Sequence, residues 1–266
     1  MSDERRVAPI RVVVAGPDGK MGRTFVAELP AQEGIAVVGG IRRNDSPAAV
    51  TKLLAGADVM VEFTHADSAA TLMRRAIDAG VRPVSGTTGM KDQELAKIDE
   101  AARARGIAAV WAPSYRLMAV LLSHFAKIAA RYADTVEVIE AHHAKKADSP
   151  SGTARELARI IRSAHGAELY DPPVRNETVA DVRGGVIGGV RIHSLRFPGL
   201  EPNGWHEVIF AGEQELLRIR HDDWGQSAYV GTVARAVRKV MEPGLVGLLR
   251  GYDAVLGLNA DGGHEA

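Results

Sequence analysis

The chain has 266 residues, enough for one large hydrophobic core or two modest ones. Its 33 basic and 33 acidic residues give a formal net charge of zero, which indicates no general attraction to nucleic acid or to an anionic membrane. The chain has no cysteine, which excludes disulfides, thiolate zinc sites and a cysteine nucleophile.

The first residues, Met1–Arg6, include acidic side chains and no apolar core, so we expect no secretory signal there. No apolar run approaches the roughly 20 residues that a membrane-spanning helix needs. We therefore expect a cytoplasmic protein without a membrane or nucleic-acid partner.

The first predicted element is a buried strand over Ile10–Ala15, an apolar run rich in β-branched residues. It leads into a loop with the spacing Gly-x-x-Gly-x-x-Gly, and a helix is predicted over Met21–Leu29. Such a loop lets a pyrophosphate approach the backbone, and the amides at the start of the helix then face the phosphates. The loop predicts a dinucleotide site formed by Gly16, Asp18, Gly19, Lys20, Met21 and Gly22.

A second buried strand is predicted over Ile35–Ile41, and Arg42 and Arg43 follow it. An NAD-specific fold of this kind carries an acidic residue near this point, which binds the ribose 2′-hydroxyl. Two arginines can instead bind a 2′-phosphate through charge-assisted hydrogen bonds. We therefore expect NADPH to be used at least as well as NADH. The alternative is that both arginines are solvated loop charges, countered by Asp45.

Further strands are predicted over Asp58–Phe63, Val81–Val84 and Ile107–Trp111, with helices over Ser68–Ala79 and Gln93–Arg105. Strands that alternate with helices predict right-handed crossovers and a parallel sheet, and therefore a Rossmann-like α/β domain.

The loop after the fourth strand contains Gly86, Thr87 and Thr88. Residues at the carboxyl end of a parallel strand face the ligand crevice, so we expect these three to contact the cofactor. A plain turn is the alternative.

The pattern changes after Trp111. A long helix is predicted over Leu117–Arg131 and a strand over Val136–Ala141, and a Pro- and Gly-rich loop or arm is expected over Asp171–Gly189. Alternating strands follow, which indicates a sheet with one solvated face; they are predicted over Val190–His193, Glu207–Phe210 and Leu217–His221.

We predict a smaller α+β domain with an open mixed sheet over residues 117–227. Residues 1–116 and 228–266 would form the dinucleotide-binding domain. Two final helices, with no strand after them, are predicted over Ala228–Met241 and Leu245–Leu256.

The segment His142–Ala154 places two imidazoles, two ammonium groups and a helix start within thirteen residues. Histidine and lysine side chains can donate protons to a reacting group. Thr153 and Glu156 have the spacing of a capping box, so a helix is predicted from Thr153. A helix start with a glycine can bind a carboxylate. The segment predicts a site for a small anion that receives a proton; a solvated loop with a plain cap is the alternative.

This segment resembles the signature of the 4-hydroxy-tetrahydrodipicolinate (dihydrodipicolinate) reductase family, Glu-x-x-Glu-x-His-His-x-x-Lys-x-Asp-x-Pro-Ser-Gly-Thr-Ala. Every fixed position is filled between Glu137 and Ala154. The glycine loop is similar to the family's Gly-x-x-Gly-x-Met-Gly, and Gly86–Gly89 to its Gly-Thr-Thr-Gly. Glu62-Phe63-Thr64 is similar to its Asp-Phe-Thr/Ser, with Glu in place of Asp.

The resemblance implies NAD(P)H-dependent reduction of 4-hydroxy-tetrahydrodipicolinate to tetrahydrodipicolinate, in diaminopimelate and lysine biosynthesis. It implies a homotetramer, with His142 and Lys146 as proton donors. It also implies that the substrate is bound by His143, Ser151, Gly152 and Thr153, and that the nicotinamide is bordered by Ala112, Ser114 and Tyr115.

Two departures from the family pattern concern the substrate. Where the family has Asn-Phe-Ser-x-Gly, this chain has Ser114–Met118, so Arg116 replaces a serine and Met118 a glycine. Gln226 stands where many members carry a substrate-binding arginine. The interpretation that we favour is that Arg116 restores the missing positive charge. The alternative is that the added bulk and the moved charge favour another acid as substrate.

Two other functions remain open on the sequence. One is a paralogous reductase of a different carboxylated imine or keto acid. The other is a non-catalytic nucleotide-sensing protein, whose mark would be a broken His-His-Lys set. We expect no metal site, because adjacent histidines lack the i, i+4 spacing that places two ligands on one helix face.

Overall fold

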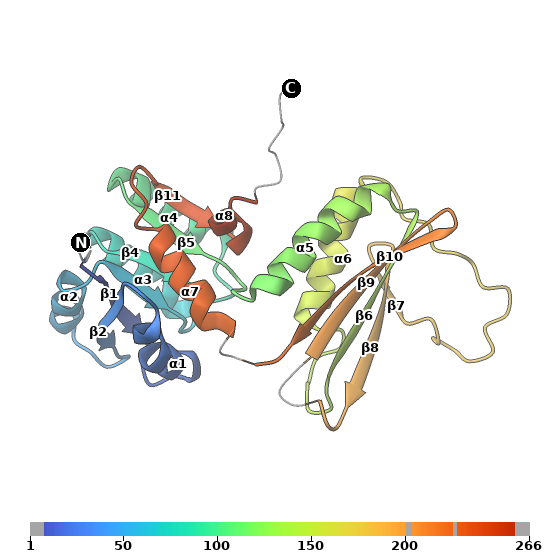
Figure 1. Cartoon of the computed structure of the whole chain (residues 1–266), viewed down its shortest axis with the longest axis horizontal. Coiled ribbons are helices and arrows are strands. Elements are labelled where there is room, and N and C mark those ends of the chain that lie inside the picture. The colour runs from blue at the N-terminus through green and yellow to red at the C-terminus, as the bar shows by residue number, and fades with distance from the viewer. Residues whose placement is uncertain (1–7, 201–203, 226–227, 259–266) are drawn as a thin grey trace, which may run out of the picture. The chain divides into compact units, whose positions relative to one another are not determined.

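The computed structural model describes residues 8–200, 204–225 and 228–258 (Figure 1). The chain divides into two compact units, one from Met1–Leu117 with Gln226–Ala266 and one from Met118–Gly225. We call them unit 1 and unit 2. No helix in the described ranges has both the length and the apolar character needed to cross a membrane.

Unit 1 contains a parallel six-stranded sheet in the order β11-β5-β4-β3-β1-β2. The chain order reverses at β1, which lies between β2 and β3, and ligands of such sheets bind at that switch point. This sheet confirms the predicted Rossmann-like α/β domain. Its strands are β1 (Ile10–Ala15), β2 (Ile35–Ile41), β3 (Val59–Glu62), β4 (Arg82–Ser85), β5 (Ala108–Trp111) and β11 (Gly247–Arg250).

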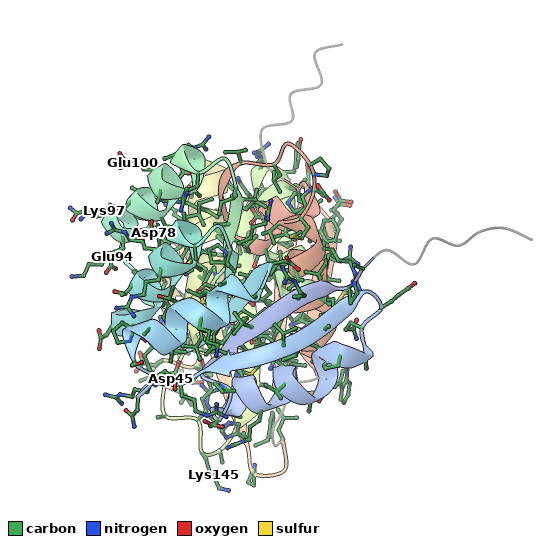
Figure 2. All side chains as sticks on the ribbon, turned by 90° about the vertical axis from the view of Figure 1, so that its left-hand side faces the viewer. Asp45, Asp78, Glu94, Lys97, Glu100 and Lys145 are labelled. Atoms are coloured by element: carbon green, nitrogen blue, oxygen red, sulfur yellow. The ribbon has the colours of Figure 1, made fainter. Side chains whose placement is uncertain are left out.

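The helices of unit 1 pack apolar faces onto this sheet, around a core that includes Met60, Met73, Ile77 and Ile98. Their outer faces are charged, and Figure 2 shows Glu94, Lys97 and Glu100 pointing away from α4. The helices are α1 (Lys20–Glu28), α2 (Pro47–Ala55), α3 (Ala66–Asp78), α4 (Asp92–Ala104), α7 (Ala228–Lys239) and α8 (Tyr252–Leu256), with a 3₁₀ turn at Leu29–Ala31.

Two elements of unit 1 differ from the sequence predictions. Helix α2 was not predicted, although Ser46 caps it and Pro47 occupies its first turn. The helix predicted over Leu245–Leu256 is wrong: β11 pairs with β5, and only the short α8 is helical. Gly247 and Gly251, with φ of +93° and +86°, cannot continue a right-handed helix, and their positive φ separates β11 from its neighbours.

Unit 2 contains a mixed five-stranded sheet in the order β10-β9-β6-β8-β7, as the prediction of an open mixed sheet requires. The central strand β6 runs parallel to β8 and antiparallel to β9. The strands are β6 (Thr135–His143), β7 (Gly185–Ile187), β8 (Val190–Phe197), β9 (Gly204–Gly212) and β10 (Glu215–Asp223).

Helices α5 (Leu117–Ala129) and α6 (Gly152–His165) lie against one face of this sheet, and a 3₁₀ turn follows α5 at Ala130–Tyr132 (Figure 1). Val136 and Val138 of β6 point into the core beneath them, together with Leu157 and Ile161 of α6. The expected arm before β8 is largely irregular, and β7 is its only strand among the described residues. Because β6 extends through His143, both histidines lie in the strand and not in the loop after it.

Candidate active site

Unit 1 has a cavity of about 360 Å³ at the carboxyl ends of its central strands. Five residues that the sequence predicted for the cofactor line it: Met21, Gly86, Thr87, Thr88 and Tyr115. The sequence reasoning assigned no cofactor contact to the other lining residues, which are Phe63, Thr64, His65, Ala66, Pro113 and Tyr229. Phe63 and Thr64 follow β3 directly, so the rule that was applied to the loop after β4 could have found them.

The glycine loop after β1 has the close packing that a phosphate-binding turn needs. Gly16 has a φ of +70°, and a Cβ on Gly22 would lie 1.9 Å from the carbonyl oxygen of Gly16. Gly19 is the N-cap of α1 and has no side chain to cap it, so the first amides of α1 are free of a side-chain acceptor. These amides fit a pyrophosphate.

The remaining residues predicted for the cofactor lie outside the cavity. Asp18 and Lys20 belong to the glycine loop and the start of α1, and Arg42 and Arg43 follow β2. Ala112 is buried, and its N–H donates to the carbonyl of Ser85 (3.0 Å). The Ser114 hydroxyl accepts from the N–H of Arg116 (3.3 Å).

A buried carboxylate lies behind the cavity wall. Glu62 is 0% exposed and accepts hydrogen bonds from the hydroxyls of Ser85 (2.5 Å), Thr64 (2.5 Å) and Thr87 (2.9 Å). The N–H of Thr64 is a fourth donor (2.7 Å). We call these four residues the Glu62 cluster. Because Glu62 accepts from residues of both loops, the cluster fixes the loops after β3 and β4 relative to each other. Thr64 and Thr87 of these loops also line the cavity.

Tyr115 and Arg116 show what the first departure from the family pattern does. Tyr115 is fully buried, its hydroxyl donates to the carbonyl of Ser85 (3.0 Å), and burial raises its pKa well above the usual value. The guanidinium of Arg116 lies over the ring of Tyr229, 4.9 Å from its centroid. Since Tyr229 lines the cavity, Arg116 lies beside the cavity wall. Gln226, the second departure, lies outside the described residues.

A second buried carboxylate organises the site in unit 2. Glu140 is 0% exposed, and Nδ1 of His142 donates to its Oε2. Both terminal nitrogens of Arg196 donate to the same carboxylate (2.9 and 3.1 Å), and the N–H of Ser151 adds a longer contact (3.3 Å). We call these residues and His206, which pairs with Glu140 across the strands, the Glu140 cluster.

The pKa of Glu140 reflects two opposing effects. Burial would raise it, but hydrogen bonds from His142, Arg196 and Ser194 together lower the pKa to about 2. Glu140 is therefore ionised at neutral pH, which favours an N–H of His142 directed at it and leaves Nε2 of that ring for another partner.

His206 is held neutral. Burial, with repulsion from His142, lowers the pKa of His206 to about 3. Its Nε2 lies 2.9 Å from the hydroxyl of Ser151, and the rings of His206 and His142 meet edge to face at 5.2 Å.

The start of α6 differs in detail from the capping box that was predicted. Ser151 is the N-cap, and its hydroxyl accepts from the N–H of Ala154 (3.2 Å), so Thr153 does not cap the helix. The N-cap lies two residues before Thr153 and the helix begins at Gly152, because Ser151 has the extended backbone that an N-cap requires. The N–H groups of Gly152 and Thr153 then lie in the first turn, where no intrahelical acceptor exists.

The other polar groups predicted for the substrate lie next to this helix start. Nζ of Lys146 is 2.6 Å from a carboxylate oxygen of Asp148, and this hydrogen bond lowers the pKa of Asp148. Nδ1 of His143 is buried without a hydrogen-bond partner among the described residues. A buried polar atom in that state suits an incoming ligand.

Glu140, His142 and His206 also place ligand atoms within 4.8 Å of one another, close enough to share a cation. Arg196 already supplies positive charge to that carboxylate, and the donor set is better explained by its hydrogen bonds than by a resident metal.

The sequence reasoning assigned no role to Glu140, Arg196 or His206. The strand alternation places Glu140 and His142 on one face of β6, a signal that was available. Arg196 and His206 are brought to the site by the register of the strands. His142 is opposite Arg196 on β8, and Glu140 is opposite His206 on β9.

Comparisons with known proteins agree over almost the whole chain. Residues 10–115 match the family model of the dihydrodipicolinate reductase N-terminus, and residues 117–250 match that of its C-terminus. The 4-hydroxy-tetrahydrodipicolinate reductase of Moorella thermoacetica is 38% identical, over 94% of this chain and 99% of the relative. That of Mycolicibacterium smegmatis is 36% identical, over 94% of this chain and all of the relative.

Solved structures give the same result. A dipicolinate-bound dihydrodipicolinate reductase from Paenisporosarcina sp. TG-14 superposes with a TM-score of 0.83 at 29% identity, covering 91% of this chain and 98% of that one. An amine dehydrogenase from Mycobacterium smegmatis, at 14% identity and a TM-score of 0.59, shares the fold.

Proposed function

We propose how the two units contribute to one reaction, starting from the family to which this chain belongs. The comparisons show that it is the dihydrodipicolinate reductase family. The protein is an NAD(P)H-dependent reductase that converts 4-hydroxy-tetrahydrodipicolinate to tetrahydrodipicolinate, a step of diaminopimelate and lysine biosynthesis. The names of substrate and product define the net change: a hydroxyl group is replaced by hydrogen. That change consumes one hydride and one proton and releases water.

Unit 1 binds the cofactor. The glycine loop and the first amides of α1 would bind the pyrophosphate, and the residues that line the cavity would surround the nicotinamide. When bound, the reduced nicotinamide supplies the hydride. The hydroxyls of Thr64 and Thr87 are already bonded to Glu62, so their methyl groups and backbone remain to contact the ring.

Unit 2 supplies the proton. His142 is the proton donor in this proposal, and the single observation that supports it best is its hydrogen bond to buried, ionised Glu140. A carboxylate that accepts from Nδ1–H fixes the orientation of the ring, which leaves Nε2 to face the substrate. Arg196 keeps Glu140 ionised and in place.

Lys146 is the second proton donor in this proposal. Its ammonium is positioned by Asp148, and it can protonate the substrate or replace the proton that His142 has given. Substrate carboxylates would be bound by the unpartnered Nδ1 of His143 and by the first amides of α6 at Gly152 and Thr153, with Ser151 capping the helix.

We also propose a cytoplasmic homotetramer. The exposed face of the unit 2 sheet carries Leu195, Phe197 and Leu216, which are 38%, 46% and 59% exposed. Contact between such faces in a second copy would remove this apolar surface from water. Light scattering on the purified protein measures the assembly directly.

Cofactor oxidation with substrate generated enzymatically in the cuvette tests the assigned reaction. We expect oxidation of NADPH and NADH by the wild-type protein. Lys146→Ala should lower turnover sharply, whereas Lys145→Ala, its exposed neighbour, should have little effect and is a matched control. An inactive wild type at every substrate concentration would contradict the substrate, and equal turnover in both variants would contradict the role of Lys146.

A further inference from the structure

An acidic side chain lies where the cofactor's adenosine ribose is expected, although the sequence after β2 has none at that point. The carboxylate of Asp18, in the glycine loop, is 2.9 Å from Nε of Arg42, the first residue after β2. The two segments meet because β1 and β2 are paired up to Ala15 and Ile41, and the N–H of Gly16 donates to the carbonyl of Ile41 (2.8 Å).

Backbone contacts hold Asp18 beside the end of β2 independently of its ion pair with Arg42. Pro17 lies directly against β2, since a Cβ on Gly40 would be 2.7 Å from its ring. The guanidinium of Arg23 donates to the carbonyl of Asp18 (2.8 Å). The position of the Asp18 carboxylate therefore depends on a packed loop and not only on an exposed side chain.

The charged groups of Asp18, Arg42 and Asp45 differ in how many of their atoms have partners. Arg42 donates to Asp18 through Nε, and its two terminal nitrogens have no hydrogen-bond partner among the described residues. Asp45, which follows β2 (Figure 2), accepts instead from the backbone N–H of Arg42 (2.7 Å). The side chains of Asp18 and Arg42 are 72% and 57% exposed, so a ligand can reach both.

We propose that Asp18 is a specificity-determining residue that sets the balance between NADH and NADPH. Its carboxylate accepts the ribose 2′-hydroxyl of NADH, in place of the acid that the end of β2 lacks. With NADPH, its charge opposes the 2′-phosphate, which the terminal nitrogens of Arg42 bind instead. This inference rests on the cofactor site proposed above, and it explains how a chain with two arginines after β2 still binds NADH.

Direct binding of each cofactor, followed by nicotinamide fluorescence without substrate, tests the inference. Asp18→Asn removes the charge and should lower the Kd for NADPH by about 3- to 10-fold. Asp18→Ala also removes the acceptor and should raise the Kd for NADH by about 3- to 10-fold. The NADPH gain should shrink at high salt, because the opposing charges are exposed.

Asp45→Asn is the matched control, since it removes a nearby carboxylate that bonds the backbone, and it should leave the ratio of the two Kd values within about twofold of wild type. Equal changes for both cofactors in the Asp18 variants, or none, would overturn the proposed role of Asp18. Failure of the wild type to bind either cofactor would instead contradict the cofactor site itself.

Discussion

The two units each bury a glutamate completely, and they satisfy the hydrogen-bonding capacity of its carboxyl group by different means. In unit 1, the donors to Glu62 are three hydroxyls and a backbone N–H, all neutral. In unit 2, Glu140 receives a guanidinium from Arg196 and an imidazole N–H from His142. The first cluster contains no second titratable side chain, and the second contains two histidines.

In the proposed mechanism, this difference separates the positioning of loops in unit 1 from proton transfer in unit 2. Neutral hydroxyls fix the distance between two loops without offering a proton donor with a pKa near neutrality. In the proposed mechanism His142 donates the proton, and the guanidinium of Arg196 helps to keep the neighbouring Glu140 ionised. The proposed cofactor and acid sites would thus use the same buried residue type for different purposes.

The largest expected effect comes from removing the titratable partner of Glu140. His142→Gln should lower turnover by about 10²–10⁴-fold, the usual contribution of a positioned acid. Cofactor Kd should stay near the wild-type value, because the residue belongs to unit 2. Steady-state kinetics with parallel cofactor titrations measure both, and near-full turnover would remove His142 from the mechanism.

The second-largest expected effect is a loss of stability when the cation of the Glu140 cluster is removed. Arg196→Met leaves a buried charge without its main partner, so the free energy of unfolding should fall by about 3–5 kcal/mol. Adding Glu140→Gln should recover part of that loss. Urea unfolding followed by the fluorescence of Trp205 and Trp224 reports on unit 2, and no recovery in the double variant would indicate that the pairing is not the cause.

Acid should weaken unit 2 through His206. Its pKa is about 3 when folded and about 6.5 when unfolded, so between these values the unfolded chain binds the extra proton. Stability should therefore decline as pH falls from about 6.5 towards 3, by at most about 1.4 kcal/mol per pH unit. Glu140 has a lowered pKa, so its contribution is complete above about pH 4.5 and is lost as pH falls towards 2.

His206→Asn separates these two effects. The variant should have a flatter profile between pH 6.5 and about 4.5 than the wild type, and the two should decline together below that range. Urea unfolding at a series of pH values gives the comparison. An equally steep decline in the variant above pH 4.5 would assign the acid sensitivity to other groups.

The smallest expected effect concerns the neutral cluster. Ser85→Ala removes one of four donors to Glu62 and should cost about 1–3 kcal/mol of stability. Trp111 reports on this change, because its indole N–H donates to the carbonyl of Thr87 (2.8 Å). Ser123→Ala, which removes a hydroxyl bonded to a helix carbonyl, is the control and should cost less. A larger loss than that of Arg196→Met would reverse the comparison.

The sequence predicted the elements whose signal is local. The bounds of β1 and β2 match the predicted strands residue for residue, since both are apolar runs that end at glycines or charges. Strand β11 was missed because the apolar pair Leu248 and Leu249 fits a helix as well as a strand. Its pairing with β5, which the sequence does not show, makes it a strand. The sequence also gives no sign of the hydrogen bond that the backbone N–H of Leu248 donates to the Asp99 carboxylate (2.7 Å).

For the sites, too, the sequence predicted the residues that are close together in the chain and missed those that the fold brings together. The sequence singled out His142, Lys146 and the helix start at Ser151 because they are close neighbours in the chain. Arg196 and His206 are more than 50 residues from His142, and only the register of three strands brings them together. The carboxylate of Asp18 escaped the rule that searches the end of β2, because the acid comes from the loop before it in the chain.

The placement of β11 beside β5 has a consequence for synthesis on the ribosome. Residues 118–225 are translated before α7 and β11, so unit 2 is available to fold while the parallel sheet of unit 1 still lacks its last strand. Until then β5 is an open sheet edge that could pair with another nascent chain. Truncating the chain before Gly247 should therefore yield an aggregation-prone protein whose second unit is intact.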